Sequence, residues 1–161
     1  MMSKLFNDLE GLKIAIEIEK RGHAFYQQAY SQAQKEEHKE LFLLLRDEET
    51  HHLAKFTSIC EKVQKDESNA DFDEETSKYL SVLAANHVFP REEEAAKRIH
   101  ELSTMDAILA TAMQAEKDSI LFYDELATKA SCSDARKVFA ALKAEEQQHV
   151  IKLREMMDAW A

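Results

Sequence analysis

The 161-residue sequence has very few residues that form turns, because it contains only two glycines and one proline. Strands and hairpins depend on such residues, so their scarcity argues against a β-sheet protein. Strong helix formers such as alanine, leucine, glutamate and lysine are abundant instead. The composition predicts an all-α protein, and the length suits a single domain over residues 1–161.

Cysteines and long apolar runs are also scarce. Cys60 and Cys132 are the two cysteines, and neither belongs to a CxxC pair, which argues against a disulfide framework or a thiolate metal site. No segment approaches the roughly 18 apolar residues of a membrane-spanning helix. The first residues, MMSKLFNDLEGL, lack the apolar core of a signal peptide. We therefore expect a cytoplasmic location and no membrane partner.

Positive charge is in the minority, with 21 lysines and arginines against 31 acidic residues and a formal net charge of −10. A surface of that sign repels phosphate backbones and anionic lipid. We therefore expect no nucleic-acid partner. The charge and the long helices would suit a homodimer, although no stretch of the sequence identifies one.

Four long segments have apolar residues at every third or fourth position, namely 8–34, 37–65, 104–130 and 134–159. Short connections within the first pair and within the last pair predict two antiparallel helix hairpins. The more polar crossover, 66–103, contains a short amphipathic piece and a second helix start at Pro90. It is long enough to run back along the bundle, which is the arrangement of ferritin-like four-helix bundles.

The stretch EETHHL at 48–53 contains two overlapping Glu-x-x-His patterns. Shifting the sequence against itself by 97 residues, without a gap, aligns this stretch with EEQQHV at 145–150. His51 then falls on Gln148, so only the second pattern recurs in both halves. The repeat therefore favours two pairs, Glu49 with His52 and Glu146 with His149.

The same shift aligns Glu19 with Glu116, and both lie on the apolar stripe of their helix, as do the two favoured pairs. Four ionised glutamates in an apolar core would lose hydration and repel one another. No stripe offers a central arginine or lysine, so we expect two divalent cations to compensate the charge. The predicted metal ligands are Glu19, Glu49, His52, Glu116, Glu146 and His149, the inventory of a dinuclear carboxylate site.

Mixed oxygen and nitrogen ligands favour iron, with manganese or zinc as alternatives. Tyr26 and Tyr123 lie two turns beyond Glu19 and Glu116, so their hydroxyls could hydrogen-bond the ligating carboxylates. The alternative for both tyrosines is an ordinary core position with the hydroxyl reaching solvent.

Several other polar residues are expected to lie outside the site. His23 follows Glu19 by one turn, but its counterpart in the repeat is Ile120, so a seventh ligand is not expected there. Glu48 and Glu145 recur in both halves and are most simply surface charges. Three histidines lie near helix ends or in the crossover and are expected to be solvated, namely His38, His87 and His100.

With these motifs in place, the chain resembles the rubrerythrin branch of the ferritin-like superfamily over nearly its whole length. AIEIEKRGHAFYQQA and AMQAEKDSILFYDELA are similar to the paired E-x6-Y helices of that branch, and RDEETHH and KAEEQQH are similar to its two E-x-x-H helices. The resemblance implies that the six predicted ligands hold a non-haem di-iron centre.

Two departures from rubrerythrins bear on mechanism. Rubrerythrins carry a further carboxylate one turn after the glutamate of the third helix, where this chain has Ser119. They also carry a CxxC…CxxC rubredoxin domain as electron donor, which this sequence lacks. We therefore expect an external electron donor protein.

Three functions follow as hypotheses. The first is a di-iron oxidoreductase of the oxidative-stress, rubrerythrin-like kind that reduces O2 or hydrogen peroxide. The second is a ferroxidase or iron-handling protein with Fe(II) as substrate. The third is a non-enzymatic structural bundle.

Overall fold

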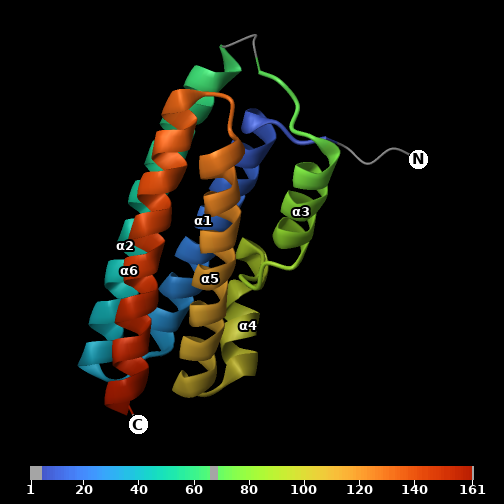
Figure 1. Ribbon diagram of the computed structural model, residues 1–161. Coiled ribbons are helices and arrows are strands. Elements are labelled where there is room, and N and C mark those ends of the chain that lie inside the picture. Colours follow the sequence, from blue (N-terminus) through green and yellow to red (C-terminus); the bar gives the residue numbers. More distant parts are fainter. Residues whose placement is uncertain (1–4, 66–68, 161) are drawn as a thin grey trace.

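Four long helices form the bundle in the computed structural model, which describes residues 5–65 and 69–160 (Figure 1). They are α1 (Asp8–Gln32), α2 (Glu36–Gln64), α5 (Met105–Lys129) and α6 (Ser133–Trp160). Each predicted boundary lies within two residues of the observed one. The described residues contain no strand, so the predicted all-α bundle of two hairpins is confirmed.

The described part of the crossover, 69–103, forms three short elements, namely α3 (Glu74–Ala85), η1 (Glu92–Glu94) and α4 (Ala95–Leu102). Asp73 begins α3 by accepting a hydrogen bond from the backbone N–H of Thr76. Figure 1 shows α3 and α4 along the side formed by α1 and α5, with α2 and α6 on the opposite side. The crossover therefore covers one side of the bundle and leaves the α2–α6 side uncovered.

The core combines large aromatic rings with alanines that let the helices approach. Phe25, Phe42, Phe122 and Phe139 are essentially fully buried, and so is Phe56. Burial of such rings is the main apolar contribution to the stability of a bundle. Among the described residues, no helix is both long and apolar enough to cross a membrane.

The buried Asp8 ties the beginning of α1 to the connection between α5 and α6. Its two carboxylate oxygens accept hydrogen bonds from the backbone N–H groups of Ser131 and Cys132, each at 2.7 Å. The side chain is 1% exposed, so water cannot replace it readily. The contact joins segments more than 120 residues apart in the chain.

We expect Asp8→Ala to lower the free energy of unfolding by about 1–3 kcal/mol, because two partly buried N–H donors would lose their acceptor. Asp8→Asn should lower the free energy of unfolding by less, since its amide oxygen can still accept one of the two hydrogen bonds. Urea unfolding followed by circular dichroism measures both values. Equal stability of Asp8→Ala and the wild type would contradict this role.

Candidate metal centre

Six side chains from the four long helices meet inside the bundle. Glu19 comes from α1 and Glu116 from α5, and α2 and α6 each contribute a Glu-x-x-His pair. Glutamate and histidine three residues apart on a helix point to the same side, so each pair enters the core together. Each of the six is at most 1% exposed, namely Glu19, Glu49, His52, Glu116, Glu146 and His149.

The six residues form two overlapping groups, each able to hold a metal ion. In each group one ligand atom of every residue lies within 4.8 Å of the others. The first group is Glu19, Glu49, His52 and Glu146, and the second is Glu49, Glu116, Glu146 and His149. Glu49 and Glu146 belong to both groups, so either position would have them as candidate ligands.

Both imidazoles turn Nδ1 toward the carboxylates. His52 Nδ1 lies 3.0 Å from Glu146 Oε1 and 3.5 Å from Glu19 Oε2. His149 Nδ1 lies 3.4 Å from Glu116 Oε1. The two rings stack with centroids 5.6 Å apart and an interplanar angle of 11°. The structure thus places His52 inside, whereas His51 is exposed on the surface.

The carboxylates are incompletely satisfied without a cation. One oxygen of each of the four glutamates is buried and lacks a hydrogen bond, namely Glu19 Oε2, Glu49 Oε1, Glu116 Oε2 and Glu146 Oε2. Buried polar atoms are normally paired, so four buried carboxylate oxygens without a hydrogen bond need an explanation. A pair of divalent ions would supply partners for all four, and the oxygen-rich donor set fits such ions.

Protonation has to balance the charge when no metal is present. Burial raises the pKa of Glu146 well above its usual value, and the charges of Glu116 and Glu19 raise it further. Burial lowers the pKa of His52, but the neighbouring carboxylates of Glu146 and Glu19 outweigh it and raise the value to about 10. Burial also opposes protonation of His149, yet Glu116 and its other acidic partners raise that pKa strongly. The metal-free site therefore holds protons where cations would bind.

The two tyrosines donate hydrogen bonds across the bundle. The hydroxyl of Tyr26 donates to Glu116 Oε1 at 2.5 Å, and that of Tyr123 donates to Glu19 Oε1 at 2.6 Å. Each tyrosine therefore contacts the carboxylate of the opposite half of the repeat. Burial raises the pKa of both phenols, and the neighbouring glutamates raise it further, so both hydroxyls keep their protons and act as donors.

Glycine at position 22 leaves room for one of the carboxylates common to both groups. A Cβ atom there would lie 3.2 Å from Glu49 Cδ and 3.0 Å from the ring of Phe89. Both distances are shorter than ordinary van der Waals contact. Gly22 is therefore explained by the close approach of the site and of the crossover to α1.

Glu48 and Glu145 are not plain surface charges, and this prediction was wrong. His52 Nε2 lies 2.7 Å from Glu145 Oε2, and His149 Nε2 makes a short contact with Glu48 Oε2. The hydrogen bond from His149 lowers the pKa of Glu48 despite its partial burial. The signal for both residues was present in the sequence, because the doublet Glu-Glu recurs at the 97-residue shift.

The structure separates the other histidines from the two candidate metal groups. His23 is half-buried and belongs to neither group. Two residues expected in solvent are not there: His38 is buried, and His87 is partly buried with Nε2 3.0 Å from the hydroxyl oxygen of Ser119. Burial lowers the pKa of His87 to about 4. The crossover packs more tightly onto α5 than its polar sequence suggested, whereas His100 is exposed.

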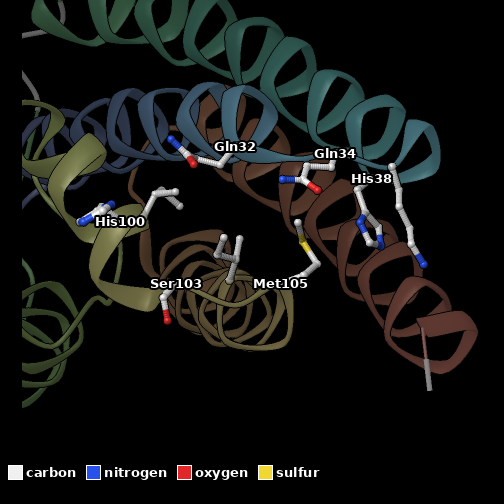
Figure 2. Close-up of a pocket in the computed structure, with 9 residues that line it drawn as sticks. Gln32, Gln34, His38, His100, Ser103 and Met105 are labelled. Carbon is white, nitrogen blue, oxygen red and sulfur yellow. The ribbon is translucent and has the colours of Figure 1, made fainter.

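Figure 2 shows a pocket of about 430 Å³ at the end of the bundle where α1 connects to α2. Gln34, His38 and Met105 approach one another there, and His100 lies at its far edge. His38 precedes Glu49 by about three turns of α2. The lining contains none of the six clustered residues, so this pocket is separate from the metal centre.

Comparisons with known proteins agree with this geometry. The family model described as Rubrerythrin matches residues 10–157. The fold is similar to the crystal structure of a protein from Thermotoga maritima that is described as a ferritin-like diiron-carboxylate protein, with a TM-score of 0.76, 25% identity and 99% of both chains covered. A search of curated proteins found no match. The family match covers nearly the whole chain, and this protein therefore belongs to the Rubrerythrin family.

Proposed function

We propose that this protein is a non-haem di-iron oxidoreductase that reduces O2 or hydrogen peroxide. The supporting observation is the buried set of four glutamates and two histidines, in which every glutamate keeps an orphaned oxygen. Such a donor set suits iron, with manganese or zinc as alternatives. When bound, a pair of iron ions would supply the electrons that reduce the oxidant.

The protein side chains would hold and orient this pair. Glu49 and Glu146, which belong to both groups, would help to hold both metals. Glu19 with His52 would complete one half, and Glu116 with His149 would complete the other. Tyr26 and Tyr123 would fix the carboxylates of Glu116 and Glu19 through their hydroxyl protons.

We propose that small oxidants and protons approach from the α2–α6 side. A surface pocket of about 540 Å³ lies there, and its lining includes His52, Glu48 and Glu145. On the opposite side, α3 and α4 cover the bundle (Figure 1). The imidazole of His52 is thus a protein group that reaches from the pocket to the buried carboxylates.

The electrons are proposed to come from a separate donor protein. The sequence has two cysteines, Cys60 and Cys132, which are too few for the CxxC…CxxC pattern of a rubredoxin domain. A homodimer, expected from the charge and the helix lengths, stays a prediction.

Iron handling is the second candidate, with Fe(II) as substrate. The observation that favours it is Ser119, which stands where rubrerythrins have an additional carboxylate. Its hydroxyl donates to the backbone carbonyl of Ala115, so it is committed to the helix rather than to the site. A centre with six protein ligands is similar to that of bacterioferritin.

Anaerobic loading with Fe(II), followed by stopped-flow exposure to O2 and to hydrogen peroxide, tests the proposal. We expect about two iron ions per chain. A peroxidase would then cycle repeatedly with a chemical reductant, without further iron. A ferroxidase would instead consume added Fe(II) in proportion to the oxidant.

Two results would contradict the assignment. Binding of less than about one metal ion per chain would eliminate the dinuclear centre, because the two overlapping groups offer two positions. Full loading without any reaction with either oxidant would leave the metal centre in place but eliminate the oxidoreductase.

A further inference from the structure

The outer nitrogen of each clustered histidine faces a carboxylate from the opposite Glu-Glu-x-x-His motif. Glu145, on α6, lies 2.7 Å from Nε2 of His52, on α2. Glu48, on α2, contacts Nε2 of His149, on α6. In both cases Nδ1 of the same ring faces the buried glutamates. Each imidazole therefore joins an inner carboxylate group to one outer carboxylate.

A lysine holds the second oxygen of each outer carboxylate. Lys55 Nζ lies 3.6 Å from Glu145 Oε1, and Lys152 Nζ lies 3.5 Å from Glu48 Oε1. Lys55 and Lys152 are separated by 97 residues, as are Glu48 and Glu145. The chain thus contains two equivalent series of lysine, glutamate and histidine, related by the same repeat as the inner site.

We infer that Glu48 and Glu145 are positioning residues for the metal-binding histidines, an inference that rests on the proposed metal centre. A histidine that binds a metal through Nδ1 must keep its proton on Nε2. A carboxylate that accepts this proton selects the tautomer and fixes the plane of the ring. Each outer carboxylate accepts the Nε2 proton of the histidine in the other motif. Each motif therefore needs the other to position its histidine.

Ordinary surface ion pairs are a weaker explanation of this arrangement. Exposed pairs contribute little and have no preferred geometry. Here the ring partners are at most 1% exposed, so their Nε2 protons depend on these acceptors more than on water. Glu145 remains partly exposed, at 45% for its side chain, and Glu48 less so at 29%. The carboxylates are therefore the link between buried rings and the surface pocket.

Zinc is a suitable probe because it is diamagnetic and inert to redox reactions. We expect Glu145→Ala and Glu48→Ala to weaken zinc binding by about 10- to 100-fold in a chelator competition. Glu61→Ala on α2 and Glu155→Ala on α6 replace exposed glutamates and should bind zinc as the wild type does. Glu145→Gln should recover part of the affinity, because its amide oxygen can still accept the imidazole proton.

NMR of the zinc-loaded protein gives the decisive readout. In Glu145→Ala the exchange-protected Nε2 proton of His52 should be lost while that of His149 remains. Glu48→Ala should give the reverse pattern. A general loss of structure would remove both protons together, so the crossed pattern is specific to positioning. If an alanine variant does not fold, the glutamine variant of the same residue is used, and it should show faster exchange of the same single proton.

Two results would overturn the inference, and they differ from each other. Both protons could stay protected, with unchanged zinc affinity, in the two alanine variants; the metal centre would then stand without these positioning residues. Alternatively, the wild type could bind no zinc, manganese or iron, and the proposed metal centre would fail together with the inference.

Discussion

Replacing Glu49 by glutamine is expected to lower the stability of the metal-loaded protein but not that of the metal-free protein. In the metal-free protein, Glu49→Gln removes one of four crowded carboxylates, so it should be neutral or stabilising. In the presence of metal it removes a residue common to both binding groups. The variant should then lose the metal-dependent stabilisation, which is about 3–4 kcal/mol for free metal at 100 to 1,000 times Kd.

Thermal unfolding with and without zinc, together with metal analysis, measures both effects. Glu61→Gln, an exposed change on the same helix, is the matched control and should behave as the wild type in both conditions. If the protein were a structural bundle that binds no metal, Glu49→Gln would have the same stability with and without zinc. Strong destabilisation of the metal-free variant would show instead that the Glu49 carboxylate has a structural partner.

Metal binding is expected to release protons and to tighten steeply as pH rises. The pKa values of His52, His149 and Glu146 are all raised in the metal-free protein, that of His52 to about 10. At neutral pH these groups hold protons that metal ions must displace. Release of roughly two to three protons per metal pair would raise the overall binding constant about 100- to 1,000-fold for each pH unit.

The same pKa shifts determine whether the metal-free protein gains or loses stability as the pH rises. A group whose pKa is raised on folding stabilises the metal-free fold below its unfolded pKa, and this contribution is lost as pH rises through the folded pKa. For His52 that interval runs from the usual value of 6.5 to about 10. The contribution of His52 to the stability of the metal-free protein should therefore be lost as the pH rises from 6.5 to about 10, while metal binding becomes stronger.

Zinc competition against a chelator at pH 6, 7 and 8, with a pH indicator in weak buffer, measures affinity and proton release together. His51→Gln is the matched control, because this exposed histidine lies beside the site and should leave both quantities unchanged. Affinity independent of pH, with no proton release, would mean that the site is already deprotonated when empty.

The inner residues of the site could be predicted because the repeat and the helical periodicity are local properties of the sequence. A shift of 97 residues distinguished His52 from His51, and the apolar stripes placed Glu19 and Glu116 on inward faces. The four helices followed in the same way, since few turn residues interrupt the pattern. Periodicity, however, determines only on which side of its own helix a residue lies.

Contacts between helices depended on the tertiary structure. The sequence put Tyr26 two turns beyond Glu19, but helix packing brings its hydroxyl to Glu116 on α5. Likewise, Glu48 lies beside the inward stripe of its own helix, and only the approach of α6 brings His149 within its reach. The polar crossover gave no sign that His87 would pack against Ser119.

The sequence by itself determined which residues face the core, because a helix with 3.6 residues per turn distributes side chains according to sequence spacing alone. The tertiary structure decided which partners they meet, because the relative position of two helices depends on all the side chains packed between them. In this protein the six buried residues belong to the first category. The crossed tyrosine and glutamate contacts that surround them belong to the second.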